Sequence, residues 1–245
     1  MGPPPDAGLR VVLLGGFMLL RGDKLIPLSQ GSQQLLALLA VRGRPVKRLL
    51  VAGTLWPNAT ENHATASLRA TVLRLRRRVT DALEVYGGDL CLRPGVSVDL
   101  HESRALADHL LQTREPVLDR DLGAATLAGL SEELLPDWYE EWVTVEAEDW
   151  RQLRLHALEA LAGSLTRAAR YGEAVAAARA AVRADPLRES SQAALIRVYL
   201  AERNRSEVIR EFKRYRALLR AELGLEPTGH LRELVKEARG TVTSR

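Results

Sequence analysis

The chain has 245 residues, of which 46% are hydrophobic and 27% charged, and its formal net charge at pH 7 is +4. Its single cysteine excludes an intrachain disulfide and a CxxC metal site, and no apolar run approaches the roughly 20 residues that a membrane span needs. The N-terminus MGPPPDAG also lacks the basic and apolar regions of a secretion signal, so we expect a cytoplasmic protein without a membrane anchor.

The charge is unevenly distributed along the chain. Residues 1–100 carry 13 basic and 7 acidic side chains, a net charge of +6, whereas residues 101–245 carry 22 and 24, a net charge of −2. A basic half joined to a mildly acidic half is typical of a polyanion-binding domain with an attached partner domain. We therefore predict two domains, 1–100 and 101–245.

Short apolar runs separated by turn residues occupy the first thirty residues. The runs are Leu9–Leu14, Phe17–Leu20 and Leu25–Leu28, and Gly15-Gly16 and Arg21-Gly22-Asp23 separate them. This pattern predicts an antiparallel meander of three short strands.

Two helices are expected next. The segment SQQLLALLAVR from Ser32 is too apolar for an exposed surface, and it ends at Gly43, a residue suited to a helix C-cap. A second helix spans about Lys47 to Leu55 and ends before Pro57, because the residue that precedes a proline disfavours the α region.

The third expected helix runs from Thr60, its predicted N-cap, to Val79. At 100° per residue its buried stripe comprises Leu68, Val72, Leu75 and Val79, extended towards the N-terminus by Glu61 and Ala64. The opposite face comprises Asn62, His63, Ala66, Arg69, Ala70, Leu73, Arg74 and Arg77, with Arg76 and Arg78 on its flanks. This outward face is small and polar at its start and cationic at its end.

A helix with these properties suits the major groove of DNA, where polar residues near its N-terminal end reach base edges and arginines reach phosphates. Most charge runs are simply solvated faces. Against that alternative, residues 40–80 hold nine basic side chains and a single acid. The candidate DNA-binding residues are Asn62, His63, Thr65, Ser67, Arg69, Arg74, Arg76, Arg77 and Arg78 on this helix, and Arg44, Lys47, Arg48 and Arg93 on neighbouring segments.

A β-hairpin is predicted after this helix. Leu83–Tyr86 and Leu90–Leu92 flank the turn Gly87-Gly88-Asp89, and Cys91 in the second strand is more consistent with a packing residue than with a nucleophile. Sheet, three helices and hairpin is the element order of a winged helix, whose third helix reads DNA.

The residues of this half resemble a known family. LRVVLLGGFMLL, LLALLAVRGRPV, LWPNA and ASLRATVLRLRRRV are similar to the winged-helix half of the streptomycete antibiotic regulatory protein (SARP) family, and the resemblance extends from Leu9 to about Glu226. These proteins are transcriptional activators with an OmpR-type DNA-binding domain. The resemblance implies double-stranded DNA as a partner, head-to-tail binding of two copies on direct repeats, and control of a secondary-metabolite pathway.

The second half is patterned as helices throughout. Asp99 is a possible N-cap for a helix over Leu100–Leu111. Further on, five pairs of similar residues are each separated by 34 residues, which is the tetratricopeptide period. The pairs are Leu161 with Leu195, Leu165 with Tyr199, Glu173 with Glu207, Ala178 with Phe212, and Ala181 with Tyr215. Paired helices at this period stack into a solenoid that normally binds proteins.

A tryptophan-rich segment, LLPDWYEEWVTVEAEDW, precedes the repeat. Trp138 and Trp142 are four residues apart, so we expect them on one helical face, packed on a neighbouring element. Eight acids lie between Glu132 and Asp149, and they could meet a basic partner. With HALEALA, YGEAV, DPLRE and ELGLEP, this segment resembles the bacterial transcriptional activation domain, which implies self-association, with a homodimer on DNA, and contact with RNA polymerase holoenzyme.

An enzyme is not predicted. The five histidines are scattered, no two lie at metal-ligand spacing, and GxSxG, Walker and GxGxxG motifs are absent. We therefore expect no catalytic residue, metal or cofactor. The predicted fold is mostly α with a small antiparallel β component, a winged helix-turn-helix followed by an all-α tetratricopeptide-like domain. The alternative function is a tetratricopeptide adaptor that binds only proteins and uses its basic half for docking.

Overall fold

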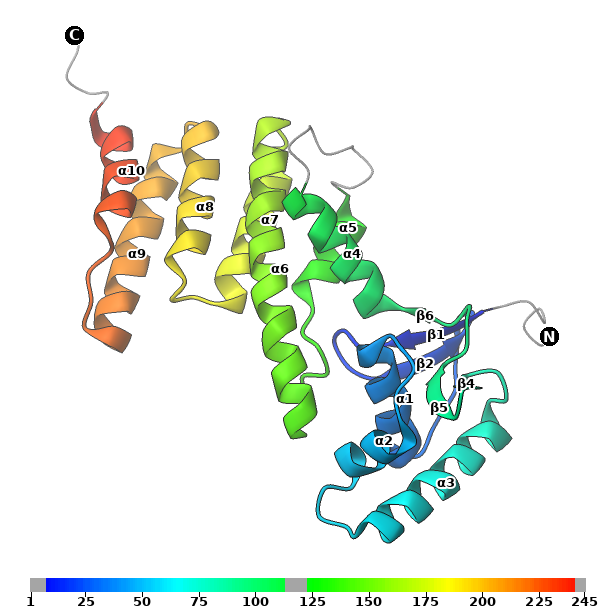
Figure 1. Ribbon diagram of the computed structural model, residues 1–245. Coiled ribbons are helices and arrows are strands. Elements are labelled where there is room, and N and C mark those ends of the chain that lie inside the picture. Colours follow the sequence, from blue (N-terminus) through cyan, green and yellow to red (C-terminus); the bar gives the residue numbers. More distant parts are fainter. Residues whose placement is uncertain (1–7, 113–122, 241–245) are drawn as a thin grey trace. The chain divides into compact units, whose positions relative to one another are not determined.

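The computed structural model describes residues 8–112 and 123–240, and most of that part of the chain is helical (Figure 1). The strands are β1 (Leu9–Val12), β2 (Met18–Arg21), β3 (Lys24–Leu25), β4 (Leu83–Tyr86), β5 (Asp89–Leu92) and β6 (Ser97–Val98). The helices are α1 (Gln30–Arg42), α2 (Arg48–Leu55), α3 (Glu61–Arg78), α4 (Asp99–Gln112), α5 (Ala124–Ser131), α6 (Glu141–Arg167), α7 (Tyr171–Ala184), α8 (Glu189–Ala201), α9 (Arg205–Leu223) and α10 (Gly229–Gly240).

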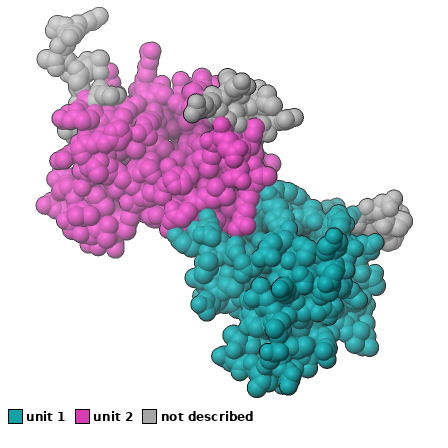
Figure 2. Space-filling view, in the orientation of Figure 1, with its two compact units in different colours: residues 1–102, 132–149 teal, residues 103–131, 150–245 magenta. Residues whose placement is uncertain are grey.

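The chain forms two compact units, which Figure 2 colours separately. The first unit comprises Met1–Glu102 and Glu132–Asp149, and the second comprises Ser103–Ser131 and Trp150–Arg245. This division differs from the predicted one because a segment from the second half of the sequence lies with the first unit. The domain boundary between residues 100 and 101 stays a prediction.

The sheet of the first unit has the strand order β3-β2-β1-β6. The predicted antiparallel meander of β1, β2 and β3 is confirmed, although β3 ends at Leu25. Pro27, which has no N–H to donate to a neighbouring strand, limits the extension of β3. The fourth strand, β6, is an addition: it pairs in parallel with β1, with Val98 beside Val11.

The carboxylate of Asp99 holds the end of β1. Its oxygens accept the backbone N–H groups of Leu13 at 2.9 and 3.1 Å, of Leu14 at 3.0 Å and of Leu100 at 2.8 Å. Asp99 was predicted to cap α4, whereas here it is the first residue of that helix and binds mainly the strand. Burial raises the pKa of this carboxyl, and the three N–H groups oppose the rise.

Replacing Asp99 with alanine is expected to lower the free energy of unfolding by about 1–3 kcal/mol, because the N–H groups of Leu13 and Leu14 lose their acceptor. Urea denaturation measures this change, and Asp23→Ala at an exposed turn is the control.

Since the folded-state pKa of Asp99 is raised, the native protein binds the proton more tightly than the unfolded chain does. The stability of the wild type relative to Asp99→Asn should therefore fall as the pH rises from the ordinary aspartate pKa through the raised pKa of Asp99. An unchanged difference across that range would contradict the assignment.

Helix α1 forms the centre of the first unit. Leu35, Leu36, Leu38 and Leu39 are buried, as predicted, and the helix packs against α2, α3, β1 and β5. It ends at Gly43, which adopts the left-handed conformation with φ of 61° and donates its N–H to the carbonyl of Leu39. The apolar core around α1 is therefore what positions α3.

The segment 132–149 completes this unit through backbone hydrogen bonds. Leu134 bridges Leu14 in antiparallel fashion. The N–H of Gly15 donates to the backbone carbonyl of Glu133 at 2.7 Å, and the N–H of Leu135 donates to the backbone carbonyl of Leu13 at 2.9 Å. Leu134 and Leu135 are buried. The segment thus extends the pairing of the chain just beyond β1.

Aromatic and polar side chains also attach this segment. Trp138 stacks on Phe17 with ring centroids 6.0 Å apart and meets the edge of Trp142 at 6.3 Å, which confirms that these tryptophans pack. They do not share a helical face as predicted, because α6 begins only at Glu141 and Trp138 precedes it. Two of the predicted exposed acids bind α1 instead: Glu140 accepts from Gln34 at 2.5 Å, and Glu146 pairs with Arg42 at 3.3 Å.

In the second unit, α7 packs on α8, α8 on α9, and α10 on both α8 and α9. The 34-residue repeat recurs in its backbone. Ala169 and Arg203, 34 residues apart, both have positive φ, of 57° and 62°. The backbone N–H groups of the residues that follow them donate equivalent hydrogen bonds. Arg170 donates to the carbonyl of Leu165 at 2.9 Å, and Asn204 donates to the carbonyl of Tyr199 at 2.8 Å. The internal repeat predicted from the sequence is therefore confirmed.

Candidate nucleic-acid interface

Helix α3 has one buried face. Thr60 caps it as predicted, since its hydroxyl accepts the N–H of His63 at 3.4 Å. The predicted stripe of Leu68, Val72, Leu75 and Val79 is buried, as is Ala64. Glu61 is exposed, so its place in the stripe was wrong: in the first turn its carboxylate stays in water, where the helix dipole favours it.

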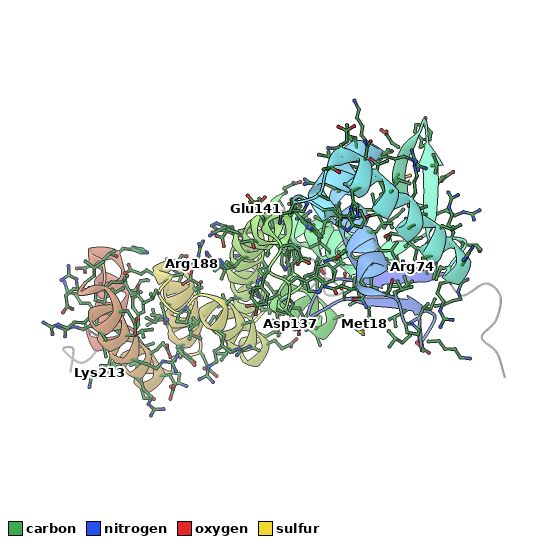
Figure 3. All side chains as sticks on the ribbon, turned by 90° about the horizontal axis from the view of Figure 1, so that it is seen from below. Met18, Arg74, Asp137, Glu141, Arg188 and Lys213 are labelled. Atoms are coloured by element: carbon green, nitrogen blue, oxygen red, sulfur yellow. The ribbon has the colours of Figure 1, made fainter. Side chains whose placement is uncertain are left out.

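The opposite face of α3 is open to solvent. Asn62, His63, Ala66, Arg69, Ala70, Leu73, Arg74, Arg76, Arg77 and Arg78 are all exposed, and Thr65 and Ser67 are half-buried at its edge. Figure 3 labels Arg74 on this helix. The helix therefore presents the small polar start and cationic end that its sequence predicts.

The five arginines of α3 are not neutralised. Within residues 8–112 and 123–240, none of their side chains forms a salt bridge or a hydrogen bond. Three other arginines of the first unit each bind a carboxylate: Arg10 with Glu102 at 2.6 Å, Arg21 with Asp81 at 2.6 Å, and Arg42 with Glu146 at 3.3 Å. The charge of α3 thus remains available to an external anion.

The first acid that follows α3 does not offset this charge. Asp81 is engaged by Arg21 of β2, whose hydrogen bond lowers the pKa of that carboxyl. Asp81, the first carboxylate after the cationic end of α3, is therefore already paired with Arg21.

The candidate cations outside α3 separate into two places. Lys47 and Arg48 are at the start of α2, which packs on α3, and the guanidinium of Arg48 donates to the carbonyl of Gly88 in the hairpin turn at 3.1 Å. Arg44 and Arg93 both line one cavity beside the hairpin. For all thirteen candidate residues, DNA contact stays a prediction.

Two exposed side chains near this surface were absent from the predicted set. Leu73 is 54% exposed in the middle of the outward face of α3, where it could contact a thymine methyl group. Tyr86 is 71% exposed at the end of β4, beside the turn residues Gly87 and Gly88. The sequence indicates the exposure of Tyr86, because this residue directly precedes a tight two-glycine turn, where few neighbouring side chains can cover it.

Within the described ranges, no cluster of three or more His, Cys, Asp or Glu side chains could hold a metal ion. No helix in the same part of the chain is long and apolar enough to cross a membrane.

A family model described as bacterial transcriptional activator domain matches residues 98–239. The regulatory protein AfsR of Streptomyces griseus is 27% identical over 248 residues, which cover 95% of this chain and 24% of AfsR, so the chain spans about a quarter of that relative. The fold is similar to that of Mycobacterium tuberculosis EmbR, solved in complex with a low-affinity phosphopeptide. The TM-score is 0.75 at 23% identity, over 97% of this chain and 66% of EmbR.

Proposed function

We propose a function for this chain from the premise that it belongs to the bacterial transcriptional activator domain family and is a SARP-type transcriptional regulator. It binds specific double-stranded DNA in the cytoplasm through α3 and recruits RNA polymerase holoenzyme to a promoter. The pathway that it controls belongs to secondary metabolism. The helical domain, residues 101–245 in the predicted division, supplies the protein contacts.

One observation carries this proposal: α3 exposes five arginines opposite a face that is buried in the core, and none of them pairs with a carboxylate of residues 8–112 or 123–240. Such a helix can enter the major groove with its N-terminal residues at base edges. Asn62, His63 and Arg69 lie in that first part of the helix. Arg76 and Arg78 lie near its end, where guanidinium groups reach phosphates.

Two arginine variants test this division of roles. Arg69→Ala is expected to cost about 1–3 kcal/mol on the specific site and to relax the sequence preference. Arg78→Ala is expected to weaken binding to all DNA alike and to lower the slope of log K against log salt by roughly one. Fluorescence anisotropy with specific and scrambled duplexes at several salt concentrations measures both effects.

Both side chains are exposed, so the variants should fold normally. Arg203→Ala, an exposed arginine of the second unit, is the matched control and should change neither quantity. If the two α3 variants lost specific and non-specific binding in equal proportion, the assignment of roles would be wrong.

The repeated backbone geometry of α6 to α9 favours a second candidate, a tetratricopeptide adaptor whose basic half docks to a protein. A gel shift on the DNA upstream of the protein's own gene, repeated at raised salt, separates the two functions. A sequence-specific activator keeps a discrete complex there, whereas an adaptor gives at most non-specific binding that salt removes.

A further inference from the structure

A cavity of about 390 Å³ lies in the first unit beside the β4–β5 hairpin and is partly open to solvent. Apolar side chains line much of it, among them Leu39 of α1, Leu92 of β5, and Val96 and Val98. Its volume lies within the range of small-molecule sites, which is roughly 300–1,000 Å³. None of the described residues that line it belongs to α3, the helix proposed to read DNA, although the lining includes two of the candidate DNA-binding residues, Arg44 and Arg93.

Two exposed arginines line the same cavity. Arg44 donates to the carbonyl of Pro45 at 3.3 Å, and Arg93 contributes at longer range to lowering the pKa of Asp81. Neither forms a salt bridge with any residue in the described part of the chain. Glu84 is the one acid among the described residues that line the cavity, so these residues carry an excess of positive charge.

His101 completes the polar part of the lining. Its Nε2 lies 2.6 Å from the carbonyl oxygen of Ala40, so that nitrogen already has a hydrogen-bond partner. Tyr86 and Glu84 also line the cavity, and among the described lining residues the two guanidinium groups are the cations left for an anionic ligand.

We propose that this cavity binds a small apolar carboxylic acid. The apolar body would cover Leu39, Leu92 and Val96, and the carboxylate would pair with Arg44 and Arg93, whose guanidinium groups match its geometry. A cationic ligand would be repelled, and a neutral one would leave both arginines without a partner. The proposal gives these two arginines a role other than DNA contact and does not depend on the proposed function.

Three compounds with one ring system test the charge requirement. 1-Naphthoic acid is expected to bind the full chain with a Kd of about 0.1–1 mM. 1-Naphthylmethanol and 1-naphthylmethylamine should bind at least about tenfold more weakly, because they lack the carboxylate. Ligand-observed NMR measures all three. In the double variant Arg44→Gln, Arg93→Gln, the acid should bind no better than the alcohol.

The cavity itself is tested by filling it. Val96→Trp should abolish binding of naphthoic acid, whereas Val85→Trp, on β4 outside the lining, should leave it unchanged. Cys91, the only cysteine of the chain, also lines the cavity and provides a second readout that needs no variant. Saturating naphthoic acid should slow its alkylation by N-ethylmaleimide several-fold, and the alcohol at the same concentration should not.

Equal binding of acid and alcohol would overturn the proposal, as would an unprotected Cys91 at saturation. If Val96→Trp fails to fold, the protection of Cys91 in the wild-type chain still decides between the outcomes.

Discussion

Insertion of about 5 bp between the two half-sites of the operator is expected to abolish activation, and insertion of about 10 bp to recover part of it. The reason is the head-to-tail arrangement that the resemblance to OmpR-type winged helices implies. In that arrangement each copy would have the same orientation, so we expect the half-sites to be direct repeats about 10 to 11 bp apart, with both α3 helices in the major groove on one face of the duplex. Insertion of half a helical turn would place one copy on the opposite side of the duplex, away from the polymerase that it would hold.

Transcription in vitro with purified RNA polymerase holoenzyme measures this effect on templates that differ only in the spacer. Footprinting of the same templates is the control, because each half-site should still be occupied at sufficient protein concentration. A footprint over an inverted repeat, or activation that is indifferent to helical phase, would contradict the arrangement. Neither result would remove the DNA-binding assignment, which depends on α3.

Fragment 1–100 is expected to be much less stable than the first unit is in the full chain. Fragment 1–149, which includes the segment 132–149, is expected to have most of that stability. The predicted boundary near residue 100 implied that fragment 1–100 would fold alone and bind DNA more weakly than the whole chain. The contacts of 132–149 change that expectation. Without this segment, Leu13, Leu14 and Phe17 lose Leu134, Leu135 and Trp138 as neighbours.

The magnitude follows from burial. Leu134, Leu135 and Val143 are each at most 2% exposed, and burying one such side chain contributes about 1.5–3 kcal/mol. Together they amount to about 5 kcal/mol or more, which is comparable with the total stability of a small domain, about 5–15 kcal/mol. Removing them should therefore leave a fragment that is unfolded or only marginally stable at 25 °C.

Urea denaturation of fragments 1–100, 1–131 and 1–149 tests this. Fragment 1–131 is the matched control, because it adds length but ends before the segment that pairs with Leu14. It restores the contacts of His101 with Ala40 and of Glu102 with Arg10, so we expect it to be slightly more stable than 1–100 but much less stable than 1–149. Equal stability of all three fragments would instead support the boundary near residue 100.

Elements governed by local periodicity could be predicted from the sequence. The buried stripe of α3, its cap at Thr60 and its cationic outer face follow from spacing along one helix. The hairpin follows from two apolar runs around Gly87-Gly88, and the repeat from pairs of residues 34 apart. In each case the residues that determine the structure are neighbours in sequence or share a fixed period.

Only the tertiary structure decided which distant segments meet. Strand β6 has two residues, too few for an alternating pattern, and it exists because β1 offers it an edge. The carboxylate of Asp99 could be predicted as a helix cap, but its binding to β1 requires residues 86 positions apart to meet. Arg44 and Arg93 are 49 residues apart in the sequence, and only the fold shows that both line one cavity; their predicted contact with DNA stays a prediction. Such contacts depend on how whole elements pack, and packing over long separations leaves no periodic signal in the chain.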